Sequence, residues 1–168
     1  MSTESASMMS GPPPASSWAA PPEFYVDENT VTRSVRRRLT GLGYVIHTPA
    51  ELYGSRDAAE GVLDEDWLPR VGTRGWIIIG RDAKIYERPH ELAAYQRARV
   101  QVFLLPGEAK AAELVELLEL NLEAMCAIGS SRQPGTWRLT ANGLRPFPVH
   151  TSSKPGGKSS GRERRHGN

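Results

Sequence analysis

The stretch that decides the fold is "WIIIG", residues 76–80. A run that is apolar throughout is typical of a central strand in a parallel sheet, because both faces of such a strand are covered. The run lies between Gly75 and the charged pair Arg81-Asp82. We therefore predict a buried central strand at residues 76–80, with helices packed on both faces of its sheet.

Upstream, the sequence predicts a strand, a helix and a second strand. Short apolar runs at residues 23–26 ("EFYV") and 44–47 ("YVIH") favour strands. Between them, apolar side chains recur at spacings of four, four and three, which predicts an amphipathic helix closed by glycine 41 or 43. These side chains are Val31, Val35, Leu39 and Leu42.

The segment 63–75 ("LDEDWLPRVGTRG") predicts the helix that leads into the central strand. It begins with acids, which suit a helix N-terminus, and it ends at Gly72 or Gly75. Pro69 lies inside this segment and costs a backbone hydrogen bond unless it falls in the first turn of the helix.

The alternation continues downstream. Residues 87–99 predict a helix and residues 100–105 ("VQVFLL") predict a strand. A long helix follows over residues 110–129, because its leucines and a methionine share one face. Residues 136–147 predict a hairpin, since the Asn-Gly pair at its centre fits the positive backbone angles of a tight turn.

Strands that alternate with helices imply right-handed crossovers and a mainly parallel sheet. The predicted fold class is therefore α/β, with three α/β/α layers and a mainly parallel central sheet. In such sheets the ligand site lies beyond the carboxyl ends of the strands.

Length and composition favour one domain between two tails. Of the 168 residues, the Ser-, Pro- and Ala-rich start and the Ser-, Gly- and charge-rich end cannot bury enough apolar surface to order themselves. We predict disordered tails at residues 1–22 and 150–168 and a domain at residues 23–149. No apolar stretch approaches the roughly 20 residues that span a bilayer. The start also lacks the features of a secretory signal, so we expect a soluble, cytoplasmic protein without membrane contact.

The basic pI of about 8.8 comes from the end of the chain rather than from its body. Residues 151–168 hold five Lys and Arg against one Glu, which leaves 16 basic and 18 acidic residues in the first 150, a net charge of −2. The body is therefore not a basic domain. The basic end is either a solubilising segment or a source of nonspecific affinity for RNA.

Three acidic positions are predicted at one edge of the sheet. Asp27 follows the first strand, Asp82 follows the central strand, and Asp64 opens the helix that leads into that strand. Asp27 and Asp64 also stand where a helix cap is useful, which is worth about 0.5–2 kcal/mol relative to Ala. Converging carboxylates repel one another unless a cation compensates, and hard oxygen ligands select Mg²⁺ or Mn²⁺. Such a site suits metal-dependent hydrolysis of a phosphodiester.

These residues resemble a known family. The ordered set "FYVDENT", "LDEDWL", "RGWIIIGRDAKI", "RPHELAAY" and "VQVFLL" is similar to the PIN-domain superfamily, in particular to the PIN-like branch of VapC-type toxins. The resemblance covers about residues 23–147. It implies a compact α/β/α ribonuclease domain whose acids bind Mg²⁺ or Mn²⁺ and which cleaves RNA, commonly silenced by a cognate antitoxin protein. Whether the chain forms a homodimer stays open.

By position, the resemblance implies that Asp27, Asp64 and Asp82 are the catalytic residues and metal ligands. Two positions depart from the family pattern. Gly80 stands where the family often has Thr, so a hydroxyl that could orient water is missing, and Lys84 stands where related sequences carry a fourth acid. Two hypotheses remain: a Mg²⁺-dependent ribonuclease of the VapC-like kind with these three acids as metal ligands for one or two ions, and a catalytically weak PIN-like module that binds RNA or a protein.

Basic side chains near these acids are candidate contacts to RNA or phosphate: Arg33, Arg37, Arg81 and Lys84. Arg33 shares one side of the first helix with Arg36 and Arg37. That side is either a solvated face or a ridge that contacts phosphates. Arg81 and Lys84 flank Asp82 and either neutralise the acids or contact the scissile phosphate.

Other chemistries find less support in the sequence. The four histidines show no metal-ligand spacing and form no arrangement with Ser or Cys, which disfavours zinc and covalent nucleophile chemistry. Cys126, the single cysteine, is predicted to be a buried, inert thiol. An Asp-nucleophile phosphatase or a phosphoacceptor domain also places Asp after a strand, but Asp27 has no second Asp two residues on.

Overall fold

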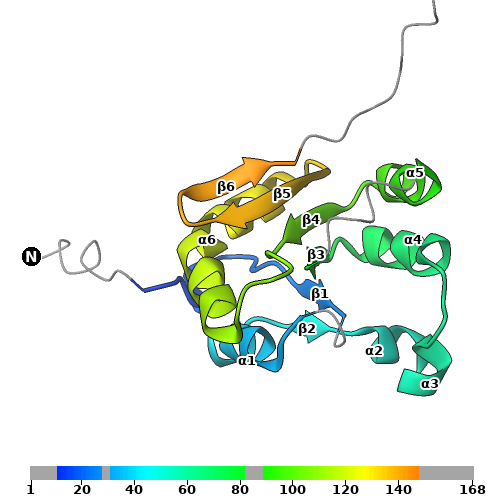
Figure 1. Cartoon of the computed structure of the whole chain (residues 1–168), viewed down its shortest axis with the longest axis horizontal. Coiled ribbons are helices and arrows are strands. Elements are labelled where there is room, and N and C mark those ends of the chain that lie inside the picture. Colours follow the sequence, from blue (N-terminus) through cyan, green and yellow to red (C-terminus); the bar gives the residue numbers. More distant parts are fainter. Residues whose placement is uncertain (1–10, 28–30, 82–88, 148–168) are drawn as a thin grey trace, which may run out of the picture.

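Six strands form one sheet in the order β2-β1-β3-β4-β5-β6 (Figure 1). The computed structural model describes residues 11–27, 31–81 and 89–147, apart from the side chains of Asp64 and Leu92. All neighbouring strands are parallel except β5 and β6, which are antiparallel. The strands are β1 (Phe24–Val26), β2 (Ile46–His47), β3 (Ile77–Gly80), β4 (Gln101–Leu104), β5 (Gly135–Thr140) and β6 (Gly143–Pro146).

Six α-helices and one short 3₁₀ turn accompany this sheet. They are η2 (Ala15–Ser17), α1 (Arg33–Gly41), α2 (Pro49–Tyr53), α3 (Arg56–Ala59), α4 (Asp64–Arg74), α5 (Pro89–Ala98) and α6 (Ala111–Ser131), all counted within the described ranges. None of these helices is long and apolar enough to cross a membrane.

The predicted central strand is β3, and it is buried between two neighbours. Its Ile78 pairs with Tyr25 of β1 on one side, and its Ile79 pairs with Phe103 of β4 on the other. The three isoleucines of β3 are each at most 5% exposed. The predictions of a buried central strand and of a mainly parallel sheet are both confirmed.

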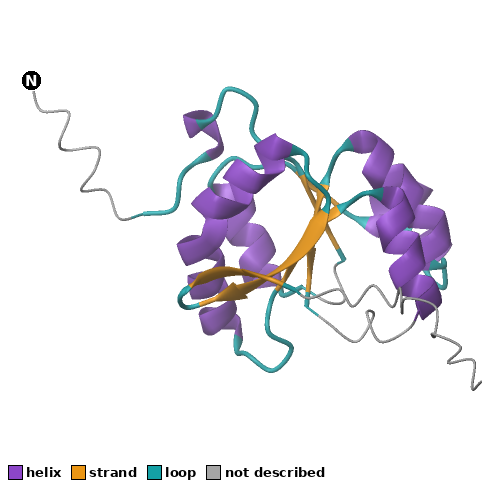
Figure 2. Cartoon of the chain, turned by 90° about the horizontal axis from the view of Figure 1, so that it is seen from above, coloured by secondary structure: helices purple, strands orange, loops and turns teal. Residues whose placement is uncertain are grey.

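Side chains of the central strands alternate between two hydrophobic cores, since successive residues of a strand point to opposite faces. Phe24 and Ile77 belong to one core, together with residues of α1 and α6. Tyr25 and Ile78 belong to the other, together with residues of α4 and α5. Figure 2 shows the strands between these two groups of helices. The three-layer α/β/α architecture that the sequence predicts is therefore present.

Between β1 and β3, the elements of the structure differ in detail from those that the sequence predicts. The second strand is confined to Ile46–His47, and two short helices, α2 and α3, occupy a region that the sequence indicated as a loop. Pro69 lies inside α4, beyond its first turn. The helix tolerates Pro69 at an exposed position, where it loses one backbone hydrogen bond without burying an unpaired group.

The predicted hairpin is formed by β5 and β6. Gly143 has a φ of +114°, whereas Asn142 is not among the described non-glycine residues with positive φ. Because Thr140 pairs with Gly143, the two turn residues are Ala141 and Asn142, and the predicted turn at Asn142-Gly143 with two positive angles is wrong by one residue. Thr140 supports the turn instead, because its hydroxyl accepts from the Asn142 N–H at 3.2 Å and donates to the Gly143 carbonyl at 2.7 Å.

Residues 11–22 pack against the domain, although the sequence predicts a disordered tail over residues 1–22. Ala15 is buried in the core with α1 and α6, and its N–H donates to the Leu42 carbonyl at 2.8 Å. Trp18 donates from Nε1 to the Tyr44 hydroxyl at 2.9 Å, and that hydroxyl donates to the Pro13 carbonyl at 2.7 Å. These contacts offset the entropy of ordering the segment, which composition alone does not reveal. The predicted tail at residues 150–168 lies outside the described residues.

Tyr44 therefore holds the N-terminal segment in place, and removing its hydroxyl should be costly. We expect Tyr44→Phe to lower the free energy of unfolding by about 1–3 kcal/mol, because the partly buried Trp18 and Pro13 groups lose their hydrogen bonds to the hydroxyl. Tyr53→Phe is the matched control, since the buried Tyr53 hydroxyl has no hydrogen-bond partner, and it should be neutral or slightly stabilising. Urea denaturation measures both; equal losses in the two variants would contradict this role of Tyr44.

Cys126 is buried in the core, as predicted, and its thiol should make stability depend on pH. Burial raises the pKa of the Cys126 thiol, while its hydrogen bond with Tyr44 acts in the opposite direction. Above the unfolded thiol pKa of about 8.5, the unfolded chain loses a proton that the folded chain keeps. The free energy of unfolding therefore keeps its full value below this pH. It falls as the pH rises from the unfolded pKa towards the higher folded pKa of the thiol.

We expect Cys126→Ala to remove this contribution. Its free energy of unfolding should decline less steeply than that of the wild type between about pH 8.5 and 10, by up to about 1.4 kcal/mol per pH unit for one proton. Urea denaturation across this range measures the difference in slope, which is independent of the constant cost of the cavity. Identical slopes would show that the thiol titrates alike in both states.

Candidate active site

Asp27 lies at the carboxyl edge of the sheet, directly after β1, as the sequence predicts. Its side chain is partly exposed, and its carbonyl accepts a hydrogen bond from the Val31 N–H at 3.0 Å. This bond joins the end of β1 to the approach to α1. The Asp27 carboxylate is therefore placed where ligands bind in open α/β sheets.

Asp64 is the first residue of α4. Because α4 leads into β3 and packs antiparallel to it, the start of α4 lies toward the same carboxyl edge as Asp27. The side chain of Asp64 and the whole of Asp82 and Lys84 lie outside the described residues. Within the described part of the chain, no group of three or more His, Cys, Asp or Glu side chains is arranged to hold a metal. The convergence of the three acids stays a prediction.

Near the start of α4, Tyr53 of α2 packs against the helix. The Arg70 guanidinium lies 4.9 Å from the centre of the Tyr53 ring. Burial raises the pKa of Tyr53, the positive charge of Arg70 opposes the rise, and the negative charge of Asp66 adds to it. The contact between Tyr53 and Arg70 therefore links the short helix α2 to α4.

Arg81 follows β3 and serves to hold a neighbouring loop. Its Nη2 donates to the Ala109 carbonyl at 2.6 Å, and its Nε donates to the Pro106 carbonyl at 3.3 Å. These bonds fasten the connection between β4 and α6 to the carboxyl end of β3. The sequence left Arg81 between neutralising the acids and contacting phosphate, and the structure adds this third role.

Gly80, the first departure from the family pattern, ends β3 beside β4. A Cβ at this position would lie 3.3 Å from Leu104 Cδ2. The contact is tight, but it involves the end of a flexible side chain that can shift. The fold therefore does not require glycine at position 80, and a residue with a side-chain hydroxyl would fit there after a small shift of Leu104.

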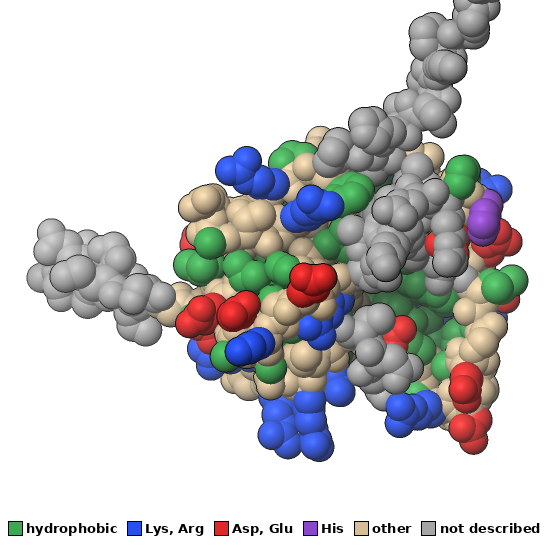
Figure 3. All heavy atoms as spheres, viewed as in Figure 1, with side chains coloured by type: hydrophobic (Ala, Val, Ile, Leu, Met, Phe, Trp, Pro, Cys, Tyr) green, Lys and Arg blue, Asp and Glu red, His purple; other side chains and the backbone are tan. Residues whose placement is uncertain are grey.

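Arg33 and Arg37 are exposed on α1. In Figure 3, Lys and Arg side chains project from the surface over this helix. The next arginine, Arg38, donates from Nε to Glu119 of α6 at 2.8 Å. The exposed pair is thus available to a ligand, whereas Arg38 links two helices.

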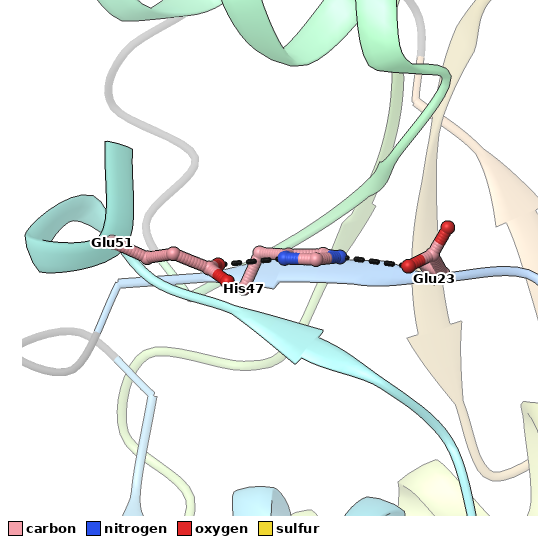
Figure 4. Close-up of polar contacts among 3 residues, drawn as sticks. All are labelled: Glu23, His47 and Glu51. Carbon is pink, nitrogen blue, oxygen red and sulfur yellow. Dashed lines mark hydrogen bonds and ion pairs between the residues drawn. The ribbon is translucent and has the colours of Figure 1, made fainter. Parts of the chain in front are cut away.

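A polar cluster that the sequence did not predict surrounds His47 (Figure 4). The Nδ1 atom lies 2.6 Å from Glu51 Oε2, and Nε2 lies 2.9 Å from Glu23 Oε1. The ring stacks on Trp76 with centroids 3.6 Å apart. The two carboxylates lie on opposite sides of the ring and do not converge on one point, so this cluster ties β2 to α2 and to the residue before β1 and does not resemble a metal site. Only the i,i+4 spacing to Glu51 was visible in the sequence.

The fold and the acid at the carboxyl edge of the sheet define a class of protein. It is a three-layer α/β domain with an acid at the carboxyl end of its first strand. The sequence matches the family described as "PIN like domain" over residues 22–107, just over half of the chain. The protein belongs to the PIN-like domain family. This fold is generally of a nuclease type, and PIN domains typically use divalent metals.

The family match extends from the residue before Glu23 to the loop after β4 and includes Asp27, Asp64 and Asp82. The helix α6 and the hairpin β5–β6 lie beyond it. No curated protein and no solved structure matches the chain.

The bonds of Arg81 predict a loss of stability on substitution. We expect Arg81→Gln to lower the free energy of unfolding by about 1.5–3 kcal/mol, as is usual for hydrogen bonds that involve a charged group. Arg33→Gln, which removes the same charge from an exposed position, should leave stability nearly unchanged. Thermal denaturation of the two variants measures this. If Arg81→Gln unfolds like the wild type, Arg81 is free for a role in substrate binding instead.

Proposed function

We propose that the protein is a metal-dependent endoribonuclease of the VapC-like kind, with Asp27, Asp64 and Asp82 as metal ligands and catalytic residues. The observation that carries this proposal is the position of Asp27 at the carboxyl end of β1 in a domain of the PIN-like family. The start of α4 at the same edge supports the inclusion of Asp64.

The chemistry of the donor set fits a hard divalent cation. Carboxylate oxygens are ligands that Mg²⁺ and Mn²⁺ prefer, and Asp27 is partly exposed, so a cation with its waters can approach it. When bound, such a cation supplies Lewis-acid stabilisation of charge on a phosphodiester. The chain itself contributes three carboxylates on separate segments, and the first of them, Asp27, directly follows β1, which pairs with the buried strand β3.

The second candidate function is a catalytically weak PIN-like module that binds RNA or a protein without cutting. Gly80 favours it, because the position offers no side-chain hydroxyl beside the predicted acids. The Lys84 charge favours it as well, since a cation replaces a fourth acid there.

The proposed biological setting follows the same family resemblance. A VapC-like toxin acts on cytoplasmic RNA and is silenced by a cognate antitoxin protein, so we propose RNA as the substrate and an antitoxin as a partner. A homodimer is compatible with this setting.

Cleavage of a mixed RNA pool with Mg²⁺ or Mn²⁺ tests the proposal. We expect cleavage by the wild type, its loss in EDTA, and a decrease of at least about 100-fold in Asp27→Asn and Asp82→Asn, because each substitution removes an electrostatic element at the reacting phosphate. Asp57→Asn is the matched control, since Asp57 is exposed on α3, outside the predicted site, and should cleave like the wild type.

Two results would count against the mechanism. Cleavage that survives EDTA, or that survives both substitutions, is incompatible with a metal held by carboxylates. RNA binding by the wild type without any cleavage would favour the binding module.

A further inference from the structure

The helix α1 carries four arginines and no acid, and the structure distinguishes them by their partners. Arg38 is paired with Glu119. Within the described ranges, Arg33, Arg36 and Arg37 have no hydrogen bond from their side chains and no ion pair. These three arginines, which we call the α1 arginine cluster, are the unpaired cations of the helix.

The members of the α1 arginine cluster share one side of the helix, because residues three and four apart are neighbours on a helix surface. Arg33 and Arg37 are exposed, and Arg36 lies at the border of the buried stripe formed by Val35 and Leu39. The cluster therefore presents two cations to solvent and a third at the boundary with the core.

Two buried polar atoms beside the cluster lack partners. Arg36 Nε and Thr32 Oγ1 are each buried without a hydrogen bond. Thr32 is the N-cap residue of α1, yet its side chain makes no capping bond. Buried polar atoms in folded proteins nearly always have a partner, so the start of α1 carries two donors that the described part of the chain leaves unsatisfied.

The cluster does not serve the stability of the helix. Like charges four residues apart, as at Arg33 and Arg37, destabilise a helix. The first turn of α1 contains no acid that would offset them. A binding partner with negative charge is the simplest reason for such a surface.

The position of the cluster identifies that partner. The bond between the Val31 N–H and the Asp27 carbonyl places the start of α1 at the carboxyl edge of the sheet, next to the proposed active site. All three side chains are guanidinium groups, whose planar fork matches the oxygens of a phosphate. The first 150 residues carry a net charge of −2, so the overall charge of the domain does not attract a polyanion and its binding to the domain depends on local groups of cations such as this one.

We propose that Arg33, Arg36 and Arg37 dock the phosphates of single-stranded RNA beside Asp27, with the exposed pair Arg33 and Arg37 and the partly exposed Arg36 contacting successive phosphates. The identification of the polyanion as RNA rests on the proposed function. The docking itself needs no metal and no cleavage, so it can be measured separately.

Fluorescence anisotropy of a labelled 12-nucleotide RNA of mixed sequence, in EDTA, tests the docking with the full chain. Neutralising the cluster in Arg33→Gln/Arg36→Gln/Arg37→Gln should raise Kd at least about tenfold near 0.1 M salt and make the slope of log K against log salt shallower by about two, since each phosphate contact on a single strand contributes about 0.7. The double variant Arg33→Gln/Arg37→Gln changes exposed residues only and should show an intermediate effect.

The matched control is Arg97→Gln/Arg132→Gln/Arg145→Gln, which removes three exposed positive charges from other elements. It should bind RNA with the affinity and the salt slope of the wild type. The basic segment after residue 150 is present in every variant and contributes equally to all of them.

Three results would overturn the inference: no binding of RNA by the wild type, equal weakening by the cluster and control variants, or an unchanged Kd in both cluster variants. Cluster-dependent binding of a labelled poly-glutamate peptide in place of RNA would assign the helix to an acidic protein, and it would also overturn the inference. Cluster-dependent RNA binding without any cleavage in Mg²⁺ would leave the inference standing and count against the proposed ribonuclease.

Discussion

The burial of β3 between β1 and β4 is the constraint on which the rest of the structure depends. Its three isoleucines must be covered on both faces, so the chain supplies α1 and α6 on one side and α4 and α5 on the other. Parallel pairing with β1 and β4 brings the carboxyl ends of these strands to one edge. The position of Asp27 follows from this arrangement, because the residue comes directly after β1.

The sequence predicts the elements that an apolar pattern defines. The run at residues 76–80 marks β3 clearly, and the spacing of Val35 and Leu39 marks the buried face of α1. The helices α2 and α3 escape prediction because they are short and have no buried stripe. Contacts between distant residues escape it too: the hydroxyl of Tyr44 meets Trp18 and Pro13, which lie in a segment whose composition resembles a tail.

In the candidate site, too, the sequence predicts positions along the chain but not contacts between distant residues. The sequence predicts correctly that Asp27 follows a strand and that Asp64 starts a helix, whereas their role as metal ligands stays a prediction. The partners of charged side chains were not visible, because they depend on which loops and helices meet. Arg81 binds the carbonyls of a loop 25 residues and more away along the chain, and Arg38 binds Glu119. Only the structure separates these arginines from the unpaired ones on α1.

The central claim is that carboxylates from β1, the start of α4 and the end of β3 form one cation site. Titration with Mn²⁺, followed by electron paramagnetic resonance of the free ion, tests this claim without requiring a substrate. The account predicts a saturable site in the wild type that is lost or strongly weakened in Asp27→Asn and retained in Asp57→Asn. Equal binding of Mn²⁺ by the wild type and Asp27→Asn would contradict it.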